Sequence, residues 1–409
     1  MRQSSFALAL LTSAVLAACG GGGGGEQAPK VKFSAQVSFG DSLSDVGTYS
    51  VGTVKALSGG KYTVNGAGAS NWTELMAAQF GLPAPCAAQT GLDGLASQGF
   101  SVPVINHAGC TAYAQGGARV TNPVGPGNKL LGGDNAVLGQ LTLPVVAQIQ
   151  RHLALNGGSF KGDEAVFVLA GGNDALIQLG ALSAGAKAAA TAAVSAAVPA
   201  QIQKDVAAGS CVPADAQASN CQPAAIAALT PTVGASAAAA YVQSNATAVV
   251  TAMGTAGAEL AGYVKSLIVA KGAHYVTVVN LPDLSVTPYA LAQSLETRAL
   301  ITAMVTTFNQ QLQGGLAGNT SVLLVDAYAV NRDQNSNPAP YGLTNVTTPA
   351  CDLSAAKNPL GSSLVCSAAN TVAGDVSHYG YADSVHPTPF ANLLLARYVS
   401  KEMVTRGWL

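Results

Sequence analysis

A serine stands in a polar turn that directly follows a stretch of alternating residues near the start of the chain. Apolar and polar residues alternate from Val31 to Phe39, which predicts a β-strand, and Gly40-Asp41-Ser42-Leu43 comes next. Open α/β sheets bind ligands just beyond the carboxyl ends of their strands, so this serine is well placed for chemistry. The same tripeptide is common in loops and at helix N-caps, so Ser42 needs partners elsewhere in the chain.

Three further blocks contain the residue types that a reactive serine needs. Asp383 and His386 lie three residues apart in a predicted loop near the end of the chain, and Gly117 and Asn173 each follow a predicted strand. Acyl transfer uses a nucleophilic hydroxyl, an imidazole base, a carboxylate that orients the base, and donors for the oxyanion. Because the carboxyl ends of parallel strands meet at one edge, we expect these blocks to converge there.

The elements that must position these blocks alternate along the chain. Apolar or alternating stretches predict five strands, at residues 31–39, 102–106, 165–170, 274–280 and 321–326. Helices are predicted at residues 72–80, 141–155, 175–208, 235–270, 291–312 and 389–408. This pattern predicts an α/β protein, a three-layer α/β/α sandwich around a mainly five-stranded parallel sheet of flavodoxin-like order. The alanine-rich residues 180–260 are expected to form a long helical insertion.

In this order and on these elements, the blocks resemble those of the SGNH or GDSL hydrolases. The motifs stand as Gly40-Asp41-Ser42-Leu43, Gly116-Gly117, Gly172-Asn173-Asp174 and Asp383-Ser384-Val385-His386, and the resemblance covers roughly residues 33–400. Residues 341–346 and 385–388 are further similar to segments of secreted lipases and of the passenger domains of autotransporter esterases.

The resemblance implies a role for each residue. Ser42 would be the nucleophile, His386 the base that takes its proton, and Asp383 the carboxylate that orients His386. The oxyanion hole would consist of the backbone N–H of Ser42, the backbone N–H of Gly117 and the side-chain amide of Asn173, with Gly116 as the alternative to Gly117. Glycine permits close approach of the backbone, and an amide donates without titrating.

Other residues of the same types have simpler interpretations. The aspartates Asp45, Asp174 and Asp283 are interpreted as loop or cap residues. Four histidines compete with His386, but none combines a carboxylate three residues before it with a helix start just after it: His107, His152, His274 and His378. The tyrosines Tyr49, Tyr379 and Tyr381 are expected to line the cleft, with packing in the core or at its rim as the alternative.

Composition limits the classes of partner. The chain has 409 residues, of which 49% are hydrophobic and only 10% charged, and its formal net charge is −1. No basic stripe is visible, so we expect no nucleic-acid partner. The absence of Cys-x-x-Cys argues against a zinc site, and we expect no metal and no cofactor. The expected partner is a small-molecule or lipid ester, and the expected state is a monomer.

The N-terminal residues predict export. Arg2 and the short apolar run 6–18 are typical of a signal peptide, and Leu16-Ala17-Ala18-Cys19 resembles a bacterial lipobox. We expect residues 1–18 to be a lipoprotein signal peptide, Cys19 to carry lipid, residues 19–30 to be a glycine-rich tether and residues 31–409 to be the hydrolase domain. The expected location is the outer membrane or cell surface, with secretion as the alternative.

Anchorage is expected through that lipid alone. Beyond the signal peptide we find no run of 18 or more strongly hydrophobic residues, and the sequence ends soon after its last motif. The remaining cysteines are even in number, which in an exported protein predicts disulfides. We pair sequence neighbours: Cys86 with Cys110, Cys211 with Cys221, and Cys351 with Cys366.

The sequence therefore predicts a serine carboxylic-ester hydrolase, an esterase or lipase for lipid or short-chain acyl esters. An acyltransferase or a carbohydrate acetylesterase would use the same triad. A surface-binding lipoprotein without activity is a further alternative, but it would be expected to have lost some motif positions, and all of them are present.

Overall fold

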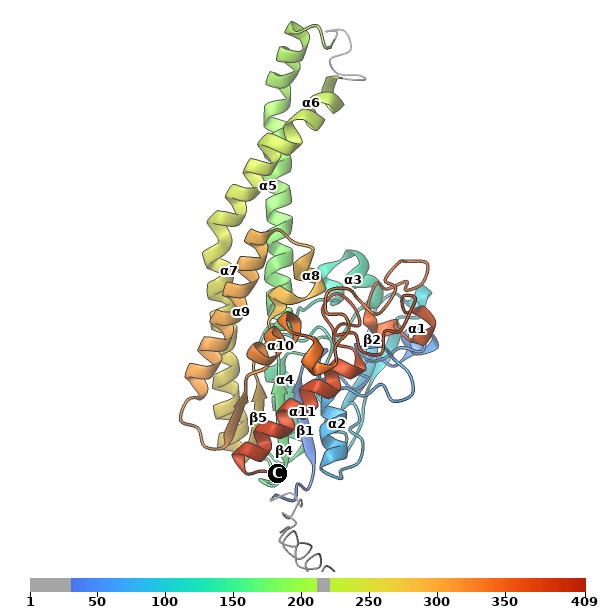
Figure 1. Cartoon of the computed structure of the whole chain (residues 1–409), viewed down its shortest axis with the longest axis vertical. Coiled ribbons are helices and arrows are strands. Elements are labelled where there is room, and N and C mark those ends of the chain that lie inside the picture. The colour runs from blue at the N-terminus through green and yellow to red at the C-terminus, as the bar shows by residue number, and fades with distance from the viewer. Residues whose placement is uncertain (1–30, 212–220) are drawn as a thin grey trace, which may run out of the picture.

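The structure is a computed structural model that describes residues 31–211 and 221–409 (Figure 1). Its strands are β1 (Gln36–Gly40), β2 (Gln89–Asp93), β3 (Ser101–Asn106), β4 (Ala165–Leu169), β5 (Tyr275–Val279) and β6 (Val322–Val325). Its α-helices are α1 (Gly52–Ala56), α2 (Trp72–Gln79), α3 (Gly133–Leu138), α4 (Val145–Leu155), α5 (Gly172–Ala207), α6 (Cys221–Leu229), α7 (Ala235–Tyr263), α8 (Pro288–Leu291), α9 (Leu295–Leu316), α10 (Ala327–Ser336) and α11 (Pro389–Arg406).

The central sheet is parallel and has four strands, in the order β1-β4-β5-β6. At the outer edge of β1, Ser38 forms an isolated parallel bridge with Ala112, and the N–H of Tyr113 donates to the carbonyl of Ser38 at 2.8 Å. This short segment occupies the position expected for a fifth strand. If it is counted, the strand order is the flavodoxin-like 2-1-3-4-5 that the sequence predicted.

Residues 102–106 were expected to form one of the five strands of the central sheet, and this expectation was wrong. That stretch is extended, as β3, but it pairs antiparallel with β2 in a separate two-stranded sheet. β2 contains Gly91 and Asp93, and the register shifts between Thr90 and Leu92. A strand with a glycine and a bulge has no clean alternation, so periodicity did not reveal the partner of β3.

Two apolar layers enclose the central sheet. On one face, α4, α5, α7 and α9 pack against residues such as Val166 and Val168 of β4. On the other face, α2, α10 and α11 pack against Phe167 and Leu169 of the same strand. Alternate residues of one buried strand thus serve opposite layers, which confirms the three-layer sandwich. Helix α2 begins with a capping box, in which the side chains of Asn71 and Glu74 each accept from the other's backbone N–H.

The alanine-rich region forms the predicted helical insertion. α5 leaves the carboxyl end of β4, and α5, α6 and α7 extend as an arm well beyond the body of the molecule (Figure 1). Helix α5 and the helical segment Cys221–Lys271 are long and apolar enough to cross a membrane by length and composition alone. This differs from the sequence expectation, because alanine raises the apolar content without forming a strongly hydrophobic run. Alanine also has the highest helix propensity, which suits helices with little core to pack on.

Three disulfides join the cysteines in the predicted pairs, Cys86–Cys110, Cys211–Cys221 and Cys351–Cys366. The last of these closes the long segment that precedes α11. Cys19, with the predicted signal peptide and tether, lies outside the described residues.

Candidate active site

The structure brings Ser42, His386 and Asp383 together, although Ser42 and His386 are 344 positions apart in the chain. The Nε2 atom of His386 lies 2.8 Å from Oγ of Ser42, and its Nδ1 atom lies 2.8 Å from Oδ2 of Asp383. Ser42 follows β1, and the other two residues lie in the loop before α11. The hydroxyl thus contacts the imidazole, and the imidazole contacts the carboxylate. This is the geometry of a nucleophile, its base and an orienting group.

The carboxylate of Asp383 is buried and surrounded by donors. The backbone N–H of Ser363 donates to Oδ2 at 2.8 Å, and those of Val385 and His386 donate to Oδ1 at 3.0 and 2.8 Å. Burial by itself would raise the pKa of Asp383, but the charge and hydrogen bond of His386 and these donors hold it well below its usual value. This lowered pKa favours the ionised form of Asp383.

Asp45 binds one of the two glycines of the second block. Its Oδ1 accepts from the backbone N–H groups of Gly47 and Thr48, as a turn-capping residue does, and its Oδ2 accepts from the N–H of Gly116 at 2.9 Å. The N–H of Gly116 is thus occupied within the protein. Gly117 lines the same cavity as Ser42, which favours it over Gly116 as a donor to a ligand.

Gly117 occupies a position that only glycine fits. Its φ is +78°, and a Cβ atom there would lie 2.2 Å from the carbonyl oxygen of Pro126. Asn173, on the first turn of α5, donates from Nδ2 to the carbonyl of Ala118 at 2.8 Å. An amide nitrogen carries two hydrogens, so this bond fixes the side chain and leaves one hydrogen to donate.

Asp174 connects the second and third blocks. Its Oδ1 accepts from Nε of Arg119 at 2.9 Å, and its Oδ2 accepts from the backbone N–H of Val120 at 3.0 Å. Burial raises the pKa of this carboxyl, and the Arg119 guanidinium opposes that rise. The residue was interpreted from the sequence as a loop or cap residue, and it lies in the first turn of α5. Its contacts also hold the chain after Gly117 against the helix that carries Asn173.

The competing histidines lie elsewhere. His107 contacts Thr90, His152 is buried against Phe160, and Nδ1 of His378 lies 2.7 Å from the carbonyl of Gly342. Burial lowers the pKa of His152 to about 4. His386 is the only histidine among the described residues that line the cavity at Ser42.

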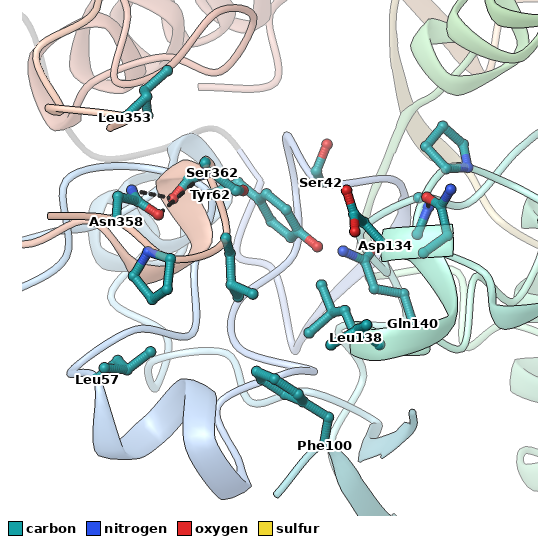
Figure 2. Close-up of a pocket in the computed structure, with 18 of the residues that line it drawn as sticks. Ser42, Leu57, Tyr62, Phe100, Asp134, Leu138, Gln140, Leu353, Asn358 and Ser362 are labelled. Atoms are coloured by element: carbon teal, nitrogen blue, oxygen red, sulfur yellow. Dashed lines mark hydrogen bonds between the residues drawn. The ribbon is translucent and has the colours of Figure 1, made fainter. Parts of the chain in front are cut away.

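A cavity of about 830 Å³ opens at these residues. Ser42, Gly117, Asn173 and His386 all line it, and Figure 2 shows an apolar wall of Leu57, Phe100 and Leu138. Opposite that wall lies the disulfide-closed segment 351–366, which contributes Leu353, Asn358 and Ser362.

Tyr62 is a lining residue that the sequence did not single out. Tyr49, Tyr379 and Tyr381 are not among the described residues that line this cavity, so the expectation that they line the cleft was wrong. Tyr49 is fully buried and donates to the carbonyl of Gly116, and Tyr381 lines a separate small cavity behind the catalytic loop. Tyr62 lies in a glycine-rich loop without periodicity, and its position depends on contacts distant in sequence.

A comparison with known protein families finds a match. The family described as GDSL-like lipase/acylhydrolase matches residues 37–399, from β1 into α11. A comparison with curated proteins found none that matches. The matched range contains all four blocks and nearly the whole folded body, so this hydrolase chain belongs to the GDSL-like lipase/acylhydrolase family.

Proposed function

We propose that the protein is a serine carboxylic-ester hydrolase that acts on lipid or short-chain acyl esters through Ser42, His386 and Asp383. The observation that carries this proposal is the continuous hydrogen-bonded series from Oγ of Ser42 through both ring nitrogens of His386 to the carboxylate of Asp383. A neutral imidazole held in this way can accept the proton of the serine hydroxyl, and the fixed anion stabilises the imidazolium that results.

The reaction follows from this geometry. Oγ of Ser42 bonds to the ester carbonyl carbon while its proton passes to Nε2 of His386. The oxyanion receives hydrogen bonds from the backbone N–H of Ser42, the N–H of Gly117 and the amide of Asn173. His386 then gives its proton to the departing alcohol and leaves an acyl-enzyme. A water molecule repeats the same steps, releases the acid and restores Ser42.

The lining of the cavity supports an uncharged acyl chain as the ligand. Leu57, Phe100 and Leu138 form one wall, and none of the described lining residues is Lys or Arg. An anionic chain would be buried there without a cationic partner, which costs free energy. The cavity volume also lies in the range of sites that enclose a small organic ligand.

The test is Ser42→Ala assayed on p-nitrophenyl esters of increasing chain length. We expect kcat to fall by a factor on the order of 10⁶, as when the nucleophile of a triad is removed. Ser44→Ala is the matched control, because Ser44 lies in the same turn but its hydroxyl accepts from the indole of Trp72. We expect this control to stay active. A Ser42→Ala protein with a tenth of the wild-type turnover would show that the nucleophile is another residue.

A further inference from the structure

The imidazole of His386 has a neighbour besides Ser42 and Asp383. The ring of Tyr62 lies with its centroid 4.8 Å from that of His386, and the two ring planes are inclined by 36°. Tyr62 is only 6% exposed. The base thus has the phenol ring over one face, while its two nitrogens face the hydroxyl and the carboxylate.

The loop that carries Tyr62 forms hydrogen bonds with the residue after His386 and with the segment that binds Asp383. Oγ1 of Thr63 donates to the carbonyl of Pro387 at 2.9 Å, directly after His386. Nδ2 of Asn65 lies 3.0 Å from the carbonyl oxygens of both Ser363 and Cys366. Ser363 is the residue whose N–H donates to Asp383. These contacts fix the Tyr62 ring relative to the base and its carboxylate together.

The hydroxyl of Tyr62 does not explain why a tyrosine is buried here. Its Oη atom is buried, and within residues 31–211 and 221–409 no group forms a hydrogen bond with it. It packs against Gly116, where a Cβ atom would be 2.1 Å away. Burying an unpaired hydroxyl costs free energy, so a favourable contribution has to come from the rest of the side chain.

We infer that the ring of Tyr62 is a positioning element for the base, which holds His386 against Ser42 and favours the imidazolium over the neutral ring during proton transfer. The face of an aromatic ring carries negative charge, and it attracts a cation within about 6 Å of its centroid. In the proposed reaction, His386 becomes such a cation when it takes the proton of Ser42. The interaction is therefore stronger in the transition state than in the resting enzyme, and this raises kcat. The inference rests on the proposed function.

The experiment compares Tyr62→Leu with Tyr62→Phe on a soluble p-nitrophenyl ester. Active sites are counted in each preparation with an organophosphonate that reacts with the nucleophilic serine, so that misfolded protein does not lower the result. We expect Tyr62→Leu to lose roughly three- to thirty-fold in kcat per active site, with KM within about two-fold. Tyr62→Phe keeps the ring and should retain nearly all of the wild-type kcat.

Phe390→Leu is the matched control. Phe390 stacks on His378 at 4.2 Å, which is a ring–histidine pair away from the cavity, so kcat per active site should not change. A Tyr62→Leu protein with the kcat of the wild type, or a Tyr62→Phe protein as impaired as Tyr62→Leu, would overturn the inference. The latter result would assign the role to the hydroxyl. An inactive wild type, or an active Ser42→Ala variant, would instead contradict the proposed function.

Discussion

Two buried carboxylates near the nucleophile have pKa values shifted in opposite directions. Burial raises the pKa of Asp41 to about 7, and the backbone N–H of Leu43, 3.0 Å from Oδ1, offsets only part of this rise. Asp383 is also buried, but His386 and three backbone N–H groups hold its pKa well below the usual value. The donors around each carboxylate, and not burial alone, therefore decide which of them is ionised.

Asp41 should make the protein less stable as the pH rises. An acid whose pKa is raised by folding contributes stability below its unfolded pKa of about 3.8 and loses it as the pH rises through about 7. For Asp41 this loss amounts to at most roughly 4 kcal/mol of unfolding free energy. Asp41→Asn removes the titration and keeps an acceptor for the N–H of Leu43.

The measurement is chemical denaturation of both proteins at pH 5 and pH 8. We expect Asp41→Asn to be more stable than the wild type at pH 8 and to differ less from it at pH 5. A variant whose unfolding free energy falls with pH as steeply as that of the wild type would show that Asp41 is ionised at low pH in the folded protein.

Ser42, Asp383 and His386 were expected to act together because their motifs resemble those of a hydrolase family, and the structure places the three side chains in contact. The sequence could not predict the hydrogen bond from Gly116 to Asp45 or the contact of Tyr62 with His386. The first spans 71 residues and the second more than 300. Contacts of this kind arise only when the sheet brings separate loops to one edge.

At the scale of elements, the glycine loop after residue 115 is fixed from two sides. Asp45, in the turn after β1, binds the N–H of Gly116, and Asp174, on the first turn of α5, binds Val120 and Arg119. Gly117 lies between these attachments. These attachments hold the backbone on both sides of the N–H that we propose as an oxyanion donor, and such preorganised donors stabilise an oxyanion most effectively.

Asp45→Asn should loosen this loop without touching the triad. Asparagine can keep its Oδ1 acceptor toward Gly47 and Thr48, but it then presents an N–H₂ group to the N–H of Gly116, and two donors repel. We expect kcat to fall roughly ten- to a hundred-fold with KM little changed, which is less than the loss of a whole oxyanion donor. Steady-state kinetics on a soluble ester measures this effect.

Asp283→Asn is the control for that variant. Asp283 is a buried carboxylate in a turn, and it accepts from the backbone N–H of Ser285. It is not among the described residues that line the cavity at Ser42. Its substitution should lower the melting temperature and leave kcat nearly unchanged. If the two variants lose kcat equally, the loss comes from stability in general and not from the glycine loop.

The elements with strong local signals were predicted and those with tertiary causes were not. β4 is a continuous apolar run, and α2 begins with a capping box, so both were evident in the sequence. β3 was assigned to the wrong sheet, because a short apolar run does not specify the strand with which it pairs. The edge of the central sheet beside β1 is held by one bridge at Ala112, which leaves no periodic pattern.

At the scale of the whole molecule, the cavity and the start of the described chain lie at opposite ends of the central sheet. The N–H of Val31 donates to the carbonyl of Trp408, and both lie near the C-terminal end marked in Figure 1. Ser42 follows the other end of β1, where α5 begins and extends into the arm. A tether that joins the chain before Val31 would therefore leave the cavity facing away from the point of attachment.

We propose that Cys19 carries the lipid of an exported lipoprotein, on the basis of Leu16-Ala17-Ala18-Cys19 and the glycine tract that follows it. Mass spectrometry of the mature N-terminal peptide should find a diacylglyceryl cysteine at this position. Cys19→Ser should lack the modification, and the protein should either remain an uncleaved precursor or be released in soluble form. Because the cavity lies at the far end of the sheet, kcat on a soluble ester should equal that of the wild type. An unmodified mature N-terminus at another residue would refute the anchor, and a Cys19→Ser protein with impaired kcat would refute the independence of the cavity from it.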